Sequence, residues 1–321
     1  MGQGRAHSNL SQPVRLYRLE RMEPPSASTT RRLETFEQHR GRLHGIAYRM
    51  LGSRAEADDI VQEAWLRWDR SATGDIRAPE AWLVTATTRL CIDRLRQLRA
   101  EREHYVGPWL PEPLTLETAP PADRAAELAS DLSVAFLAVL ERLAPEERAA
   151  FLLHDLFDSG YDDIAQILGK SEEACRQIVS RARKRVRADQ PRVQVSVEAR
   201  KRLLHRLVEA VQSQDPAVLM DVLAEDATWT SDGGGKAKAA KKVVHGAEHV
   251  ARFATGVFHR HLEHVEFRDV VVNDEPGIAA FVGGQLLSVM SILTDGEKIL
   301  GVYSILNPDK LHGVAAPVTA G

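Results

Sequence analysis

A run of prolines divides this chain more sharply than any other feature of its sequence. Between residues 107 and 123, prolines stand at Pro108, Pro111, Pro113, Pro120 and Pro121. Each proline removes a backbone hydrogen-bond donor and clashes with the preceding helical turn, so no helix continues through the segment. The sequence therefore predicts an extended linker over residues 107–123, with separately folded parts before and after it.

Apolar residues recur with helical spacing on both sides of this linker. One helical block spans residues 32–106, and a second spans residues 124–190, where Gln190-Pro191 interrupts the pattern. Residues 1–31 are polar and show no periodicity, which predicts a disordered tail. Residues 191–321 form a third part of different character.

Helices and strands are mixed in this third part. Helical patterns occupy residues 196–213, 216–224 and 247–259. Strand-like stretches run from Val265 to Val272, Ile278 to Val282, Leu286 to Leu293 and Ile299 to Leu306. The dipeptide Asp295-Gly296 between the last two stretches is a signal for a β-hairpin. Helices followed by a curved antiparallel sheet predict an α+β cone.

Composition restricts the class of protein. A chain of 321 residues is long enough for two or three domains, and its formal net charge of −3 argues against indiscriminate coating of nucleic acid. No apolar run is long enough to span a bilayer, and the N-terminus lacks the apolar core of a signal peptide. Cys91 and Cys175 lie far apart inside helical apolar patterns, which predicts two buried, reduced thiols in a cytoplasmic protein.

The first block contains a helix whose start is marked by a capping box from Ser53 to Glu56. An apolar stripe along this helix is formed by Ile60, Val61, Ala64, Trp65 and Trp68. The side chains of Asp59, Gln62 and Glu63 lie off the stripe, where they face solvent or a partner. An ordinary amphipathic bundle helix shows the same pattern, and the pattern alone favours that interpretation over a partner-binding face.

A basic helix follows, opened by Pro79 at a position where proline is tolerated. Its predicted apolar face consists of Leu83, Ala86, Leu90, Cys91, Leu95 and Leu98. Its basic residues are Arg89, Arg94, Arg96, Arg99 and Arg102. A one-sided basic helix suits contact with phosphates, and a solvated charged face is the alternative.

The second block shows the spacing of a helix–turn–helix. A short helix over residues 161–168 ends at Gly169, and Ser171 caps the helix that follows. The apolar side of that helix carries Ala174, Cys175, Ile178, Ala182 and Val186. The opposite side carries Arg176, Ser180, Arg183, Lys184 and Arg187, flanked by Gln177 and Arg181. Arginine and glutamine can read guanine and adenine edges while further cations contact phosphates, so DNA binding is favoured over a charged bundle helix.

Taken together and in this order, the two helical blocks resemble the extracytoplasmic-function sigma factors of bacterial RNA polymerase. The run Asp59-Ile60-Val61-Gln62-Glu63-Ala64-Trp65 is similar to the polymerase-binding helix of their region 2 domain. The resemblance implies polymerase contacts for Asp59, Gln62, Glu63 and Trp65.

The segment from Trp82 to Arg96 is similar to the region 2 helix that handles the minus-10 promoter element. This implies DNA contacts for Arg89, Arg94 and Arg96, although many relatives have Asn where this chain has Arg89. The second block resembles region 4, which reads the minus-35 element. The DNA contacts that this implies are those of Ser171, Arg176, Gln177, Ser180, Arg181, Arg183 and Lys184.

Three short motifs narrow the resemblance to the subgroup that carries a C-terminal SnoaL-like domain. They consist of Trp109, Leu110, Pro111, Glu112 and Pro113 in the linker, Asp232, Gly233, Gly234, Gly235 and Lys236 in the third part, and Asn307, Pro308, Asp309, Lys310 and Leu311 near the end. The resemblance implies that these motifs make regulatory contacts between domains. It covers residues 32–311 and implies a multidomain fold, with two all-α sigma domains and an α+β SnoaL-like cone.

The third part offers little evidence for catalysis. Cones of this class enclose a pocket, and its candidate lining residues are Asp226, Trp229, His245 and His249. Their spacing demands no acid–base pair, so neither an enzyme nor a cofactor is predicted, and a small-molecule ligand is left open. His259, His261 and His264 are close in sequence but are expected to point apart, so no metal site is predicted.

The predicted function is that of a cytoplasmic sigma factor that directs core RNA polymerase to promoters and helps to open them. Its expected partners are core polymerase and the minus-35 and minus-10 elements, with no membrane and no dedicated anti-sigma factor required. Its own C-terminal domain is expected to modulate it. The alternatives are an effector-sensing transcriptional regulator and a SnoaL-type enzyme with a DNA-binding appendage. A regulator needs only the helix–turn–helix and gives no reason for the helix from Asp59 to Trp65.

Overall fold

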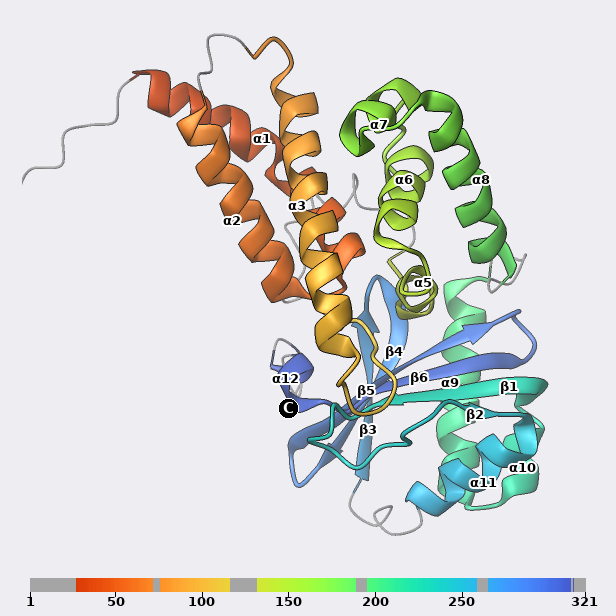
Figure 1. Ribbon diagram of the computed structural model, residues 1–321. Helices are drawn as coiled ribbons and strands as arrows, with labels where there is room; N and C mark the ends of the chain where they lie inside the picture. The colour runs from red at the N-terminus through yellow and green to blue at the C-terminus, as the bar shows by residue number, and fades with distance from the viewer. Residues whose placement is uncertain are drawn as a thin grey trace, which may run out of the picture.

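The computed structural model describes residues 27–71, 76–115, 132–188, 195–258, 265–312 and 314. The helices of both sigma-like blocks lie on one side of a six-stranded sheet, and the first half of the linker passes between α3 and that sheet (Figure 1). Outside the described residues lie most of the expected tail, the end of the linker, the break at Gln190-Pro191, and the segment with His259, His261 and His264.

The first block consists of α1 (Ala27–Leu51), α2 (Arg54–Arg70) and α3 (Pro79–Arg102). Helix α1 begins inside the segment predicted as a tail. Its first turns are held by contacts with the end of α2. The indole of Trp68 donates to the Arg32 carbonyl at 3.1 Å, and Arg32 donates to the Asp69 carbonyl at 2.5 Å. Tertiary contacts therefore extend a helix that its own periodicity did not reveal.

Only half of the predicted capping box at the start of α2 forms. The Ser53 hydroxyl accepts from the Glu56 amide at 3.5 Å, as expected. The Glu56 carboxylate does not return to the cap, because it binds the guanidinium of Arg94 at 2.6 and 2.7 Å. A bidentate, charge-assisted pair is stronger than a single cap bond. The linker residue Glu112 also binds the start of α2, where its carboxylate accepts from the Arg54 amide at 2.9 Å and from the Ser53 hydroxyl at 3.2 Å.

Helix α3 buries a broader face than predicted. Leu83, Cys91, Leu95 and Leu98 are buried as expected, whereas Ala86 and Leu90 are half-buried. The additional buried residues are Val84, Thr87, Thr88 and Ile92. The reason is that α3 packs against α1 and α2 on one side and against α6 and α7 on the other.

The second block consists of α5 (Val134–Leu140), α6 (Pro145–Asp155), α7 (Tyr161–Leu168) and α8 (Glu172–Ala188). The predicted helix–turn–helix is confirmed. Gly169 ends α7 in the left-handed conformation at a φ of 64°, which favours glycine, and the Ser171 hydroxyl accepts from the Ala174 amide at 3.2 Å. The predicted stripe of α8 is buried, except that Val179 joins it and Ala174 is half-exposed. One continuous apolar core contains side chains of both blocks.

The C-terminal domain begins with α9 (Val197–Ser213) and α10 (Pro216–Met220). Its remaining elements are β1 (Leu223–Asp232), β2 (Val244–His245), α11 (Ala247–Phe258), β3 (Val265–Val272), β4 (Glu275–Val282), β5 (Gln285–Thr294), β6 (Ile299–Ile305) and α12 (Pro308–Leu311). The sheet order is β2-β1-β6-β5-β4-β3, in which β1 and β6 are parallel and the other pairs antiparallel.

The four predicted strands and the hairpin at Asp295-Gly296 are confirmed, but β1 was missed. The predicted helix over residues 216–224 stops at Met220, and β1 starts at Leu223. The last four residues of β1 are all buried, so the strand lacks the alternation that identifies a half-exposed strand. Both faces of its end are covered because it passes from the domain's own core into the contact with the linker.

The two faces of the sheet serve different cores. Helices α9, α10 and α11 cover one face, where Trp229, Ile278 and Met290 lie in the domain's own core. The other face carries a second cluster in which Val272, Val289 and Ile305 surround Leu110 of the linker and Val134 of α5. The sheet therefore contacts both the linker and the second helical block.

Cys91 and Cys175 are buried free thiols, as predicted. Burial raises the pKa of both, which keeps them protonated and unreactive. Among the described residues, no helix is both long and apolar enough to cross a membrane.

A turn between β3 and β4 fastens the sheet to the first block. Asn273 and Asp274 in this turn both have positive φ. The Asn273 side chain accepts from the Leu114 amide at 3.0 Å and donates to the Tyr48 hydroxyl at 2.8 Å. That hydroxyl in turn donates to the Glu112 carbonyl at 2.6 Å. Burial raises the pKa of Tyr48, so its hydroxyl remains a donor.

We expect Tyr48→Phe to lower the free energy of unfolding by about 1–3 kcal/mol, because two buried polar partners lose their bond while the ring stays in place. Chemical denaturation followed by circular dichroism measures this. Tyr161→Phe is the matched control, since the ring of Tyr161 contacts His154 and Arg176 and its hydroxyl is not part of this network. The control should stay within about 0.5 kcal/mol of the parent. Equal effects of the two substitutions would contradict a structural role for the Tyr48 hydroxyl.

Candidate nucleic-acid interface

Helix α8 presents its basic side to solvent, as the sequence predicts. The exposed residues are Ser171 at its start and Arg176, Gln177, Ser180, Arg181 and Lys184 along it. The guanidinium of Arg176 lies 4.9 Å from the centre of the Tyr161 ring and pairs with Glu172 at 3.0 Å. Both charged partners are about half exposed, so the pair is weak and Arg176 can exchange it for DNA.

Arg183 differs from its neighbours on α8. Its guanidinium is half-buried and binds both oxygens of Asp155 at 2.7 Å, so that it ties α8 to the end of α6. The hydrogen bond to Asp155 raises the pKa of Arg183. In this conformation the side chain supports the helix–turn–helix from inside and is not available to a phosphate.

The predicted DNA-contacting arginines of α3 are all engaged. Arg94 binds Glu56 and lies 3.0 Å from Glu101, and the bond to Glu56 raises its pKa. Arg89 donates to the carbonyls of Gln166 and Ile167, at 2.7 and 3.0 Å, at the end of α7. The helix expected to handle one promoter element therefore packs against the motif expected to read the other, and α3 and α7 lie side by side (Figure 1).

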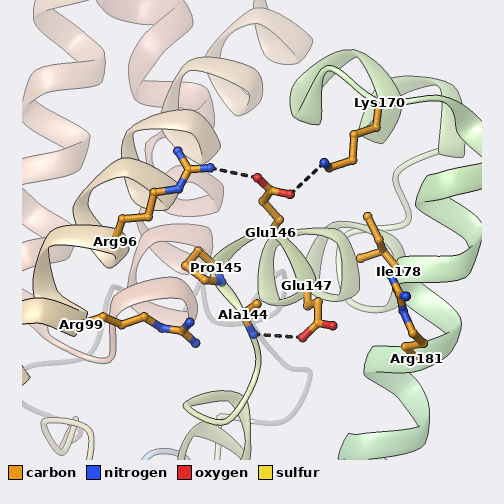
Figure 2. A pocket seen from close by; sticks show the side chains of 9 residues that line it. All are labelled: Arg96, Arg99, Ala144, Pro145, Glu146, Glu147, Lys170, Ile178 and Arg181. Carbon is orange, nitrogen blue, oxygen red and sulfur yellow. Dashed lines mark hydrogen bonds and ion pairs between the residues drawn. The ribbon is translucent and has the colours of Figure 1, made fainter. Parts of the chain in front are cut away.

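A polar cleft of about 490 Å³ lies beside this contact, at the N-terminus of α6. Figure 2 shows the carboxylate of Glu146 between Arg96 of α3 and Lys170 of the turn after α7, at 2.9 and 3.1 Å. Arg99 and Arg181 lie on opposite sides of the same cleft. Burial lowers the pKa of Arg99, which also donates to the Leu143 carbonyl.

Asp59, Gln62 and Glu63 lie off the buried stripe of α2, as expected, whereas Trp65, predicted to lie on that stripe, is not among its buried residues. Asp59 and Gln62 are exposed, and Glu63 forms an exposed pair with Arg67 at 2.9 Å. Trp65 is half-buried, with its ring centre 5.1 Å from that of Phe36. The side chains of Asp59, Gln62 and Glu63 are therefore accessible to a partner in this structure.

The three sequence motifs meet at the buried carboxylate of Asp232, at the end of β1. This side chain is fully buried and accepts from the Leu110 amide at 2.8 Å, the Tyr105 hydroxyl at 2.5 Å and the Lys310 ammonium at 2.7 Å. Lys310 also donates to the Leu110 carbonyl. A buried charge is tolerated only when it is paired and hydrogen-bonded, and every partner here comes from another segment. We refer to Asp232 and these three partners as the latch.

The linker tryptophan, Trp109, lies next to the latch and contacts Lys310. The indole of Trp109 lies between two cations, 3.5 Å from the guanidinium of Arg102 and 4.0 Å from the ammonium of Lys310. Its edge rests on Gly52, where an added Cβ would lie 2.6 Å from the ring. Gly52 also has a φ of 68°, so glycine is required there for two reasons.

The glycine run permits a close approach of backbone to side chain. At Gly234 an added Cβ would collide with the Asn307 side chain, and φ is 56°. Asn307 donates to the Tyr105 hydroxyl at 2.9 Å. The run ends in Lys236, which forms an exposed pair with Asp309. The run is therefore a contact loop rather than a phosphate-binding loop.

Protonation of the latch follows from its burial. Burial lowers the pKa of Lys310 to about 8, and the charge of Asp232 opposes that shift. Burial and the bond to Asp232 raise the pKa of Tyr105. Near neutral pH, Lys310 is therefore largely charged and Tyr105 is a donor.

The candidate pocket residues of the C-terminal domain differ in burial. Trp229 is part of the apolar core, with its ring 5.9 Å from that of Phe253. Asp226, His245 and His249 are exposed. Strand alternation places Ala227 and Trp229 inward, which turns Asp226 outward. No metal-binding group of His, Cys, Asp or Glu occurs in the part of the chain that the structure describes.

Sequence reasoning missed three residues that hold these surfaces together, namely Tyr105, Glu146 and Asn273. Tyr105 lies four residues before the linker motif, which begins at Trp109, and that proximity was the available signal. Glu146 and Asn273 act across long sequence separations and lie in no motif.

Comparison with family models matches all three parts of the chain. The model of sigma-70 region 2 matches residues 35–101, that of sigma-70 region 4 matches residues 133–186, and that of the SnoaL-like domain matches residues 204–299. The ECF RNA polymerase sigma factor SigJ of Mycobacterium tuberculosis is 38% identical over 290 residues, which cover 87% of this chain and 92% of SigJ. This chain belongs to the extracytoplasmic-function sigma factors.

Two further similarities support this sigma factor's assignment. SigI of Mycobacterium tuberculosis is 33% identical over 291 residues, covering 88% of this chain and 96% of SigI. The crystal structure of SigJ matches with a TM-score of 0.69 at 37% identity, covering 88% of this chain and 98% of that one. The predicted family and fold class are confirmed. Sigma factors bind core RNA polymerase and promoter DNA, and this one directs the polymerase to promoters.

Proposed function

We propose that the SnoaL-like domain holds regions 2 and 4 of this sigma factor in a closed, poorly active arrangement. The observation that carries the proposal is the latch, because one buried carboxylate on the SnoaL-like domain binds both the linker and α12. The linker joins the two sigma domains, so its attachment to the sheet limits the distance between them.

The second cluster on the sheet supports the same conclusion. Leu110 and Val134, from the linker and region 4, are 1% exposed in that cluster. Opening the sigma domains without moving the sheet would expose this apolar surface to water, which is unfavourable. The SnoaL-like domain therefore covers surface on the linker and on region 4 at the same time.

The closed arrangement is also incompatible with promoter opening. Arg89 and Arg96 of α3 are bound to region 4. The same groups cannot at that moment contact unstacked bases or phosphates of a melted promoter. Core polymerase or an inducing signal must therefore release region 4, and in this proposal no separate anti-sigma protein is needed to restrain it.

The alternative of a SnoaL-type enzyme finds no support in the candidate residues, since Asp226, His245 and His249 are exposed and Trp229 is part of the apolar core. The alternative of an effector-sensing regulator leaves the exposed polar face of α2 without a role. The proposed action on core polymerase places the protein in the cytoplasm.

We expect Asp232→Asn to loosen the closed arrangement, because it leaves Lys310 buried without a countercharge, a loss of about 3–5 kcal/mol. Trp109→Ala should act in the same direction by removing the ring between two cations. Small-angle scattering should show a larger radius of gyration for both variants. Transcription from a cognate promoter with core polymerase should rise in parallel.

The matched control for the latch is Asp309→Asn. It removes the same charge from a neighbouring motif, but its pair with Lys236 is exposed and contributes about 0–1 kcal/mol. Shape and transcription should stay at the parent values. The proposal would be contradicted if the unsubstituted protein were already extended in solution. It would also be contradicted if Asp232→Asn and Trp109→Ala changed neither the radius of gyration nor transcription.

We further propose that α8 reads the minus-35 element through Arg176 and Arg181. Replacing either with alanine should cost about 1–3 kcal/mol of binding to the cognate promoter and relax upstream specificity. Lys184→Ala should weaken binding to all sequences alike and reduce the salt slope by about 1. Binding of the reconstituted holoenzyme, titrated over salt concentration, separates the two classes. Unchanged binding in all three variants would show that α8 is not the reading helix.

We also propose that Asp59, Gln62, Glu63 and Trp65 dock on core polymerase. Asp59→Lys or Glu63→Lys should reduce co-elution with core enzyme and leave the circular dichroism spectrum intact, since both side chains lie off the buried stripe. Glu209→Lys on α9 is the control, an equivalent charge reversal at an exposed site of the SnoaL-like domain. Normal co-elution of the α2 variants would exclude this surface as the docking site.

A further inference from the structure

The cleft between regions 2 and 4 contains more cations than its own carboxylates neutralise. Its four cationic lining residues are Arg96, Arg99, Lys170 and Arg181. Its acidic lining residues are Glu146 and Glu147. Glu147 is engaged within region 4, where it accepts from the Ala144 amide at 3.1 Å and pairs with Arg185 at 2.5 Å. Glu146 is therefore the cleft carboxylate that faces the cations of both domains.

The geometry of Glu146 is that of a bridge. One carboxylate oxygen is 2.9 Å from Arg96 of region 2, and the other is 3.1 Å from Lys170 of region 4 (Figure 2). A phosphodiester also offers two equivalent charged oxygens, and it binds the same two residue types. We propose that Glu146 occupies the place of a DNA phosphate, and that the phosphate backbone of promoter DNA displaces it as the two domains separate.

The exposure of this bridge suits exchange. The side chains of Arg96, Glu146 and Lys170 are 54%, 35% and 35% exposed. Exposed pairs are weak and are screened by salt, whereas a duplex carries a dense row of phosphates. Closure and DNA binding therefore compete for the same two cations, and Glu146 tilts that competition toward closure.

The inference rests on the proposed DNA-binding roles of α3 and α8, and it concerns a contact that the latch does not touch. Glu146→Gln keeps the size of the side chain and removes the charge that competes with phosphate. Glu147→Gln is the matched control, because it removes the same charge one residue away at the same helix N-terminus but breaks no contact with region 2.

The experiment titrates a fluorescent promoter duplex with the full chain and measures anisotropy at low and at moderate salt. Circular dichroism first establishes that both variants are folded. Glu146→Gln should bind about three- to tenfold more tightly than the parent at low salt, and the gain should shrink as salt rises. Glu147→Gln should gain less than about twofold, the general effect of one fewer negative charge.

Two results would overturn the inference. An equal gain in both variants would show a general charge effect, and no gain in Glu146→Gln would show that the bridge does not oppose DNA. In either case the proposed DNA-binding role of α8 is retained if the unsubstituted protein binds the duplex and Arg176→Ala lowers that affinity. A parent that fails to bind the duplex at low salt also overturns the inference, since no phosphate then reaches the cleft, whereas the latch is tested separately by Asp232→Asn.

Discussion

The docking of the SnoaL-like domain on the linker depends on one buried carboxylate. Asp232 is charged and has no exposed surface, so its position is acceptable only where donors surround it. Those donors are a linker amide, a hydroxyl just before the linker and an ammonium from the last helix. None of the three segments can shift alone without leaving a buried charge or dipole unpaired. The glycines at positions 52 and 234 allow the required closeness, because a Cβ at Gly52 would collide with Trp109, and a Cβ at Gly234 would collide with Asn307 and the Tyr105 hydroxyl.

A second set of contacts joins regions 2 and 4 directly and relies on arginine. Arg148 is 1% exposed and donates to carbonyls in both regions, those of Leu140 and Met50, at 2.8 and 2.7 Å. Arg42 and Arg89 of region 2 likewise donate to backbone carbonyls of region 4. Guanidinium groups suit this purpose because they offer several donors in a fixed plane. Beneath them the two regions share one apolar core, so closure buries surface as well as forming polar bonds.

Local pattern was sufficient for much of this structure. The helix–turn–helix, the cap at Ser171, four strands and the hairpin at Asp295-Gly296 follow from periodicity and turn chemistry, which act over a few residues. The exposed side of α8 was predictable for the same reason. The failures involve distant partners. Glu56 binds Arg94 of α3 instead of closing the predicted capping box. The end of β1 does not alternate between buried and exposed residues, because the linker covers its second face.

The candidate site divides in the same way. The motifs contained Asp232, Leu110 and Lys310 of the latch, but they gave neither the geometry of these residues nor the part played by Tyr105. They also offered no sign of Asn273, whose bond to Tyr48 spans 225 positions. The basic face of α3 was visible in the sequence. The contact of this face with region 4 could not be predicted from the sequence. Arg89 binds the backbone carbonyls of Gln166 and Ile167, and a backbone carbonyl is present at every residue whatever its side chain.

The two proposed restraints on this sigma factor, the latch and the bridge through Glu146, differ in burial and therefore in their response to salt and DNA. The latch is buried, so salt screens it little, and it yields only when the linker and sheet part together. The bridge through Glu146 is exposed, so its ions exchange readily and respond to the phosphate charge of an approaching duplex. DNA alone can thus compete for the cleft but cannot relieve the buried charge at Asp232. Full separation of regions 2 and 4 requires in addition a force on the linker or the sheet. In the proposed mechanism, core polymerase supplies this force when it binds the sigma domains.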